Sequence, residues 1–183
     1  EVGWRDIASV AEEVRSAGAQ ALEVVSNVTD PEAVASLVAS TLERFGRVDF
    51  VINNAGAARG SDRVPVVELA IEDWHKVMNV NLNGTFYMSR AFGQVLVEQG
   101  EGGAIINISS IAGKALPPNT AAYAASKSAI QALSASMARE IGRHNVRVNA
   151  ICPGIIDPYR MDEIGRGERW DAMLKTIPLG RAG

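Results

Sequence analysis

The chain has 183 residues, enough for one domain with a sizeable core, and 47% of them are hydrophobic while 21% are charged. This ordinary globular balance excludes a disordered tail, a collagen-like fibre and a low-complexity linker. Eighteen Lys and Arg residues against 21 Asp and Glu residues give a formal net charge of −3 without a basic block, so we predict no nucleic-acid partner.

The first part of the chain alternates between helical and strand patterns. Apolar residues recur at helical spacing over 7–14, and Gly18 follows as a helix stop. The apolar run at 21–25 has the length of a strand. Thr29 then precedes a proline and, three positions on, a glutamate, which is a capping box that predicts a helix ending at Gly46.

The middle of the chain continues this alternation. A buried strand is predicted at 48–52, and a helical pattern at 71–97 is broken somewhere around 79–84. Several glycines then mark a turn. The next strand is predicted at 104–108.

The last part begins with a long alanine-rich helical pattern at 121–143. Asn145 suits the left-handed position that closes such a helix. A further strand is predicted at 146–152, and the remainder, 155–183, is charged.

This order of elements predicts an α/β fold. We expect a Rossmann-like, doubly wound parallel sheet with right-handed crossovers and helices on both faces, which makes three layers. No internal repeat or linker divides the chain, so 1–183 is expected to belong to a single domain. In such sheets, ligands bind outside the carboxyl ends of the strands.

Membrane and metal partners are not predicted. The longest stretch without a charged residue, 77–89, is far shorter than the roughly 20 apolar residues that a membrane span needs. Cys152 is the only cysteine, which excludes an internal disulfide and favours a reducing, cytoplasmic location. With His75 and His144 as the only histidines, we predict no metal site.

The ends of the four predicted strands carry small and amide residues. Glycine lets a flat ligand approach the backbone, and asparagine supplies both a donor and an acceptor. Turn chemistry alone accounts for any one of these sites, but four at one edge favour a shared binding site. The residues are Asn27-Val28, Asn53-Asn54-Ala55-Gly56, Ser109-Ser110 and Pro153-Gly154.

Tyr123 and Lys127 are four residues apart on the predicted helix, so the ammonium lies beside the phenol. A neighbouring cation favours the phenolate of a tyrosine, which makes the pair a plausible proton donor or acceptor near neutral pH. Ser110, at the preceding strand end, would face the same crevice. The alternative for the pair is an exposed helical contact without a role.

Together these motifs resemble the short-chain dehydrogenase/reductase family, and most of all its 3-oxoacyl-carrier-protein reductases. The similarity spans 27–154 and includes the motif 53–56, Asn81, Ser110, and the pair Tyr123 and Lys127. It implies transfer of a hydride between a nicotinamide cofactor, NAD or NADP, and a small ketone or secondary alcohol substrate.

The resemblance also implies a role for each motif residue. Tyr123 would be the general acid/base, and Lys127 would support its phenolate and bond the nicotinamide ribose. Ser110 would orient the substrate oxygen, and Asn81, at the helix break, would help to relay protons. The resemblance also implies the residues that would contact the cofactor: Asn27, Val28, Asn54, Ala55, Gly56, Tyr123, Lys127, Pro153, Gly154 and Ile156.

Two larger features follow from the same resemblance. The family is usually a homotetramer joined through two long helices, here 79–97 and 121–143, and a loop, here 155–175, covers the substrate. The family's glycine-rich phosphate loop is not found in this sequence, and Pro158 replaces a common threonine. We therefore expect a domain truncated at both ends, which alone would bind NAD(P) poorly.

Two other functions fit the same residues. A dinucleotide-sensing protein without catalysis could keep the fold but would not be expected to retain Asn81, Ser110, Tyr123 and Lys127 together. A hydrolase using Ser110 and Lys127 is the second alternative, although the sequence has no GxSxG nucleophile elbow.

Overall fold

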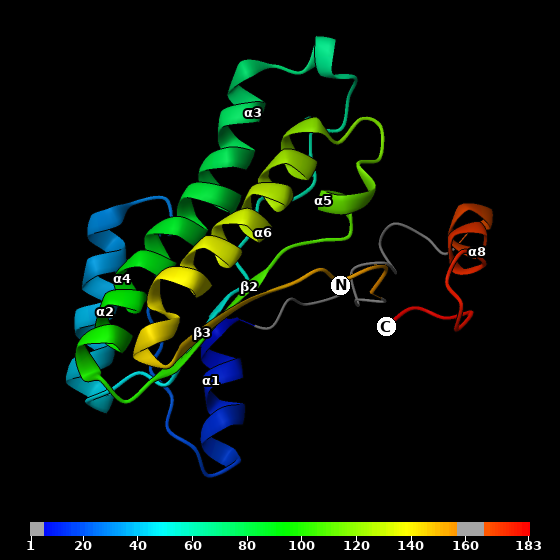
Figure 1. Cartoon of the computed structure of the whole chain (residues 1–183). Coiled ribbons are helices and arrows are strands. Elements are labelled where there is room, and N and C mark those ends of the chain that lie inside the picture. Colours follow the sequence, from blue (N-terminus) through cyan, green and yellow to red (C-terminus); the bar gives the residue numbers. More distant parts are fainter. Residues whose placement is uncertain (1–5, 157–166) are drawn as a thin grey trace.

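The computed structural model describes residues 6–156 and 167–183 (Figure 1). The strands are β1 (Phe50–Asn53), β2 (Gly103–Ile108) and β3 (Val146–Ile151). The helices are α1 (Ile7–Ser16), α2 (Pro31–Phe45), α3 (Ile71–Met78), α4 (Gly84–Gln99), α5 (Ala112–Ala115), α6 (Ala121–Ile141) and α8 (Glu168–Leu174). Single turns lie at Val66–Glu68, Asn79–Asn83 and Gly142–His144.

The three described strands form one parallel sheet in the order β1-β2-β3. Asn53 pairs with Asn107 between β1 and β2, and Ile106 pairs with Asn149 between β2 and β3. Helices α2, α4 and α6 lie on one side of the strands and α1 on the other (Figure 1). The predicted α/β, Rossmann-like class with a parallel sheet is confirmed.

The hydrophobic core lies between the sheet and helices α4 and α6. Leu96 of α4, Ile105 of β2 and Val146 of β3 are fully or almost fully buried there. Phe50 and Ile52 of β1 alternate with buried neighbours and point to the opposite face, where they are exposed. The core that the structure describes is thus built on one face of the sheet.

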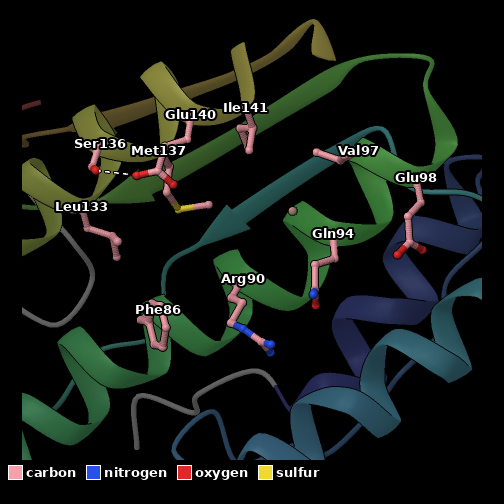
Figure 2. A pocket seen from close by; sticks show the side chains of 11 residues that line it. Phe86, Arg90, Gln94, Val97, Glu98, Leu133, Ser136, Met137, Glu140 and Ile141 are labelled. Carbon is pink, nitrogen blue, oxygen red and sulfur yellow. Dashed lines mark hydrogen bonds between the residues drawn. The ribbon is translucent and has the colours of Figure 1, made fainter. Parts of the chain in front are cut away.

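Helices α4 and α6 lie side by side on this face and leave a groove of about 420 Å³ between them (Figure 2). Phe86 and Leu133 line one end of the groove, and Val97 and Ile141 line the other. Charged and polar side chains stand along the same stretch: Arg90, Gln94, Glu98, Ser136 and Glu140.

Helix ends follow the predicted stops but not every predicted cap. Gly18 and Gly46 have φ values of 85° and 77°, and Asn145 has 60°, so all three adopt the left-handed conformation expected of them. The predicted cap at Thr29 is wrong. Asp30 caps α2 by accepting the N–H of Glu32 at 2.9 Å, because the hydroxyl of Thr29 instead donates to the Asn27 side chain.

The strand predicted at 21–25 is also absent. A strand needs a neighbour to complete its hydrogen-bond ladder, and none of the described strands runs beside this segment. The side chain of Val25 is 95% exposed as a result. Sequence periodicity identified an extended apolar run, but it could not supply the pairing partner.

The predicted break in the 71–97 helix is confirmed. Residues Asn79–Asn83 form a π-helical turn between α3 and α4. Such turns interrupt the regular hydrogen-bond ladder and occur often at functional sites. Here the turn directs the side chain of Asn81 into the interior, where it is fully buried.

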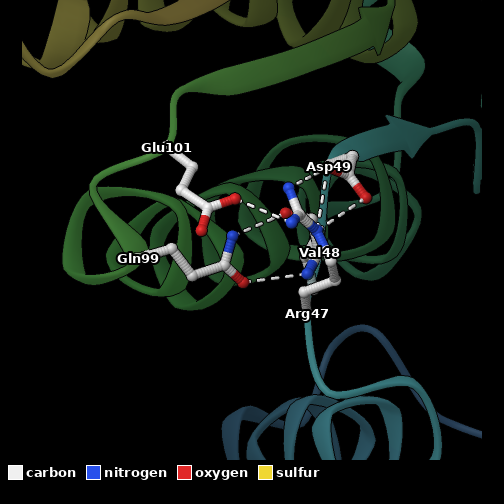
Figure 3. A network of polar contacts seen from close by, with 5 residues as sticks. All are labelled: Arg47, Val48, Asp49, Gln99 and Glu101. Atoms are coloured by element: carbon white, nitrogen blue, oxygen red, sulfur yellow. Dashed lines mark hydrogen bonds and ion pairs between the residues drawn. The ribbon is translucent and has the colours of Figure 1, made fainter.

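Polar contacts hold the chain just before β1 against the end of α4 (Figure 3). The Gln99 side chain accepts the N–H of Val48 at 2.8 Å and donates to its carbonyl at 2.7 Å, so it satisfies both backbone groups of this buried residue. Arg47 pairs with Asp49 at 2.6 Å and with Glu101 at 2.7 Å. These ion pairs are exposed, so the amide contacts contribute most of the stability.

Replacing Gln99 with alanine should therefore lower the free energy of unfolding by about 1 to 3 kcal/mol, because both backbone groups of Val48 lose their partner. Alanine is the better helix former, so helix propensity cannot account for a loss. Urea unfolding measures the change. Gln20→Ala removes the same side chain from an exposed site and serves as the control. Equal stability of the two variants would contradict the assignment.

Candidate active site

The carboxyl ends of the strands meet at one edge of the sheet, as predicted. Beyond the strands themselves, the N–H of Ser109 donates to the carbonyl of Ile151 at 2.8 Å. The N–H of Ile111 donates to the carbonyl of Pro153 at 2.9 Å. The segments after β2 and β3, which carry predicted site residues, therefore run side by side.

Lys127 is a buried ammonium at this edge. The residue is only 6% exposed. Its Nζ donates to the carbonyl of Ile108, the last residue of β2, at 2.8 Å. Nζ also lies 5.8 Å from the ring centroid of Tyr123. Burial lowers the pKa of Lys127, because the low-dielectric surroundings disfavour its charged form.

Asn81 joins two of the segments that form the site. Its Oδ1 accepts the N–H of Ala57 at 2.7 Å, and its Nδ2 donates to the hydroxyl of Ser126 at 3.0 Å. Ser126 in turn donates to the carbonyl of Tyr123 at 2.8 Å. The buried amide thus ties the loop after β1 to the N-terminal part of α6, and it makes no hydrogen bond with Lys127.

Ser110 lies at the start of the segment that leads into α5. Its Oγ accepts the N–H of Ala112 at 3.1 Å, and no acceptor for its own hydroxyl proton lies among residues 6–156 and 167–183. The hydroxyl is half-buried and can still donate to a ligand. This arrangement suits a hydroxyl that orients a ligand.

Gly113 allows the Ser110 segment to lie close against α6. A Cβ atom at Gly113 would stand 2.8 Å from the backbone carbon of Lys127 and 2.8 Å from the backbone nitrogen of Ser128. Ser128 also donates to the Gly113 carbonyl at 2.6 Å. The absence of a side chain therefore brings the segment of Ser110 alongside the helix of Tyr123 and Lys127.

Ser109 secures the same junction. It is buried, and its Oγ donates to the carbonyl of Lys127 at 2.7 Å while it accepts from Gln131 at 3.1 Å. Of the two adjacent serines, Ser109 is buried with its hydroxyl bonded to α6, and Ser110 is half-buried with its hydroxyl bonded only to Ala112 among the described residues. The sequence patterns had already singled out Ser110 of this pair, and the packing gives Ser109 a separate, structural role.

A buried ladder of amides and hydroxyls lies beneath the site. Asn53 donates through Nδ2 to Ser89 at 2.8 Å and to Asn107 at 2.7 Å, and Asn107 donates to Ser134 at 2.9 Å. The ladder crosses from α4 through β1 and β2 to α6. Sequence patterns had marked only Asn53, because the other members look like ordinary polar residues in a strand or helix.

The predicted cofactor-binding residues occupy several places at this edge. A small cavity brings Val28, Asn54 and Ala55 together, and Gly84 lies so close that a Cβ there would be 2.8 Å from Val28 Cγ2. Gly56 borders the Asn81 side chain, 3.4 Å from where its own Cβ would stand. Asn27 closes a local turn by accepting from Thr29.

The remaining predicted contacts follow β3. Pro153 is fixed by its carbonyl as described above, Gly154 has open space around it, and Ile156 is exposed. Residues 157–166 of the predicted substrate loop, 155–175, lie outside the described residues, and they include Pro158.

Arg63 is a site neighbour that the sequence analysis missed. Its guanidinium carbon lies 4.2 Å from the ring centroid of Tyr123, closer than Nζ of Lys127. The adjacent Asp62 is only 4% exposed and lies 3.2 Å from Nε of Arg63. Both residues belong to an irregular loop without any periodicity, so their sequence carried no signal beyond two adjacent opposite charges.

In the described part of the chain, no helix is long and apolar enough to cross a membrane, and no group of three or more His, Cys, Asp or Glu side chains could hold a metal ion.

A family model described as short chain dehydrogenase matches residues 3–169. The 2-dehydro-3-deoxy-D-gluconate 5-dehydrogenase of Dickeya dadantii is 34% identical over 173 residues, which cover 94% of this chain and 67% of that protein. The 3-oxoacyl-[acyl-carrier-protein] reductase FabG of Thermotoga maritima is 36% identical over 159 residues, which cover 87% and 63%.

Among solved structures, NAD+-bound xylitol dehydrogenase superposes with a TM-score of 0.89 at 33% identity, covering 97% of this chain and 73% of that chain. The present chain spans about two thirds of the length of the curated relatives that it matches.

Proposed function

This chain belongs to the short-chain dehydrogenase family, whose members are NAD(P)-dependent enzymes, and we propose on this basis that it transfers a hydride between a nicotinamide cofactor and a ketone or secondary alcohol. The cofactor would be NAD or NADP, and it supplies the hydride when bound. Tyr123 would exchange the proton that accompanies this transfer, as general acid in reduction and as general base in oxidation.

The burial of Lys127 beside Tyr123 carries the proposal. Lysine is seldom buried without a carboxylate partner, and no ion pair holds Lys127 within the described ranges; its one hydrogen bond goes to a backbone carbonyl. A buried, unpaired ammonium is costly, so its position next to a phenol supports a catalytic rather than a structural role.

The other residues support the same chemistry. The hydroxyl proton of Ser110 has no acceptor among the described residues, so it would be able to hold the substrate oxygen next to Tyr123. Asn81 would act mainly by fixing the loop after β1 to the turn that carries Tyr123. A water-mediated proton relay from Asn81 to Lys127, which the resemblance implies, would need a bridge between these two side chains.

The edge of the sheet would supply part of the lining for a flat dinucleotide. Small residues follow β1, and the close contact of Gly84 with Val28 keeps the neighbouring cavity free of side-chain bulk. Val28, Asn54, Ala55 and Gly56 would line the cofactor there, with Asn27, Pro153, Gly154 and Ile156 further along the edge. The loop 155–175 would cover the substrate.

The experiment that tests the function is a spectrophotometric assay of the complete protein with NADH or NADPH and a panel of ketones. A decrease in absorbance at the nicotinamide band supports the dehydrogenase. Cofactor binding without any change in absorbance would instead favour the dinucleotide sensor of the same fold. Release of acid from an ester without cofactor would favour the hydrolase.

We further propose a cytoplasmic homotetramer. The groove between α4 and α6 would receive the same helices of a second copy around a two-fold axis. Its ends are apolar, and its side chains include Arg90 together with Glu98 and Glu140 (Figure 2). Because both signs of charge lie on one patch, two copies of the patch can complement each other.

Light scattering of the complete protein should therefore give the mass of a tetramer. Leu133→Asp should release smaller species, because a carboxylate at the groove would be desolvated in the interface. Ala39→Asp, a change on the exposed surface of α2, should leave the tetramer intact. A monomeric wild-type protein would contradict the assembly.

A further inference from the structure

We propose that Arg63, held by Asp62 over the ring of Tyr123, binds the carboxylate of the substrate, so that the enzyme acts on hydroxy acids and oxo acids in preference to neutral alcohols and ketones. The inference rests on the proposed function and deepens it by naming a substrate class. Neither residue belongs to the catalytic motifs that the sequence analysis identified.

The position of Arg63 carries the first step. Its guanidinium carbon lies 4.2 Å from the ring centroid of Tyr123, at the distance of a cation–π contact. The phenol oxygen is bonded to this same ring. A substrate whose reacting oxygen meets that phenol therefore places the rest of its short carbon chain within reach of the guanidinium.

Asp62 fixes Arg63 in this position. The carboxylate is anchored because its Oδ1 accepts the N–H of Gly60 at 3.1 Å, and the N–H of Arg63 donates to the Gly60 carbonyl at 3.3 Å. The other oxygen, Oδ2, lies 3.2 Å from Nε of Arg63. This contact is an ion pair without a hydrogen bond, because neither Oδ2 nor Nε has a hydrogen-bond partner among the described residues.

The opposite edge of the guanidinium remains available. Among the described residues, Nε of Arg63 is buried without a hydrogen-bond partner, and no side-chain hydrogen bond of the guanidinium is formed. The two N–H groups along that edge match the two oxygens of a carboxylate, and the arginine fork binds this group with two parallel hydrogen bonds.

Charge and burial favour an anion at this edge. The side chain of Arg63 is only 18% exposed, so hydrogen bonds to it compete little with water. Around the Tyr123 ring, the cations Arg63 and Lys127 outnumber the anion Asp62. A substrate carboxylate would balance the remaining positive charge, whereas a neutral alcohol would leave it uncompensated.

Matched substrates test the proposal on the complete protein. D-Gluconate and D-sorbitol share a six-carbon polyol chain and differ in the carboxylate, as do 3-hydroxybutyrate and 1,3-butanediol. Arg63→Met should lower kcat/KM for the acids by about 10- to 100-fold, mainly through KM, and change kcat/KM for the neutral partners less than about threefold. Arg63→Lys, which keeps the charge but loses the fork, should fall between.

Arg59→Met removes an exposed arginine from the same loop and should leave both acids and neutral substrates unaffected. An equal loss for acids and neutral compounds in Arg63→Met would overturn the proposal, because it would reduce Arg63 to a support for the Tyr123 ring. A preference of the wild type for D-sorbitol 6-phosphate over D-gluconate would also overturn it, because the bound anion would then be a phosphate.

A binding measurement separates this proposal from the proposed function. With NADH or NADPH present, D-gluconate should raise the Tm of the wild type but not that of Arg63→Met, and D-sorbitol should raise neither. This pattern without turnover would count against the dehydrogenase while supporting the carboxylate site. Equal Tm shifts for the two proteins would count against the site, whatever the activity.

Discussion

Replacing Tyr123 with phenylalanine should lower kcat by about 10²- to 10⁴-fold and leave NAD(P)H binding nearly unchanged. The change removes only the hydroxyl that would exchange a proton with the substrate. The ring remains to contact Arg63, and the backbone carbonyl of Tyr123 still accepts from Ser126. The fold of the site should therefore persist while the chemistry fails.

Steady-state kinetics measure the fall in kcat, and calorimetric titration with NADPH and NADH measures the binding of the cofactor. Tyr87→Phe makes the identical change on α4, where the ring contacts Phe86 at a centroid distance of 5.7 Å, and should keep full activity. Activity of Tyr123→Phe within threefold of the wild type would remove Tyr123 from the mechanism.

Replacing Lys127 with methionine should have an effect of similar size but a different character. We expect kcat/KM to fall by about 100-fold or more, because the phenolate of Tyr123 loses its nearby ammonium. If Lys127 also bonds the nicotinamide ribose, the Kd for the cofactor should rise about tenfold. Weakened cofactor binding would distinguish this variant from Tyr123→Phe. Unchanged kcat/KM and Kd would contradict both roles.

The pH dependence of Lys127 follows from its burial. Because its folded-state pKa is lowered, the ammonium is lost at a lower pH than that of an exposed lysine, and activity should fall early on the alkaline side. Between the two pKa values the unfolded chain binds more protons than the folded chain. The stability of the wild type relative to Lys127→Met should therefore rise with pH across the alkaline range, as urea unfolding would measure.

The sequence predicted those parts of the fold that depend on local chemistry. The left-handed closure at Asn145 and the break near Asn81 both follow from residue type and periodicity, and the structure confirms them. The prediction of a strand at 21–25 was wrong, because a strand forms only beside a pairing strand and no local pattern specifies that partner. The helix α2 is capped by Asp30 and not by Thr29. Both adjacent residues have side chains that can cap a helix, and only their geometry in the structure distinguishes them.

The candidate site divides in the same way. Tyr123 and Lys127 could be found because their spacing on a helix is fixed by the chain itself. Arg63 could not, because its approach to Tyr123 depends on the path of an irregular loop. The role of Gly113 could not be predicted either. Only the packing of the Ser110 segment against α6 shows that this position has no room for a side chain.

The amide ladder beneath the site has a consequence for how the chain finds its native sheet. Asn53 and Asn107 are paired residues of β1 and β2, and their side chains bond each other inside the core. A shift of β1 by one residue would turn Asn53 to the opposite face and leave Asn107 and Ser89 buried without their partner. Hydrophobic side chains would tolerate such misalignment far better than amides do. The ladder therefore penalises out-of-register pairing, and the register that satisfies it also sets the candidate site residues after β1 and β2 beside each other.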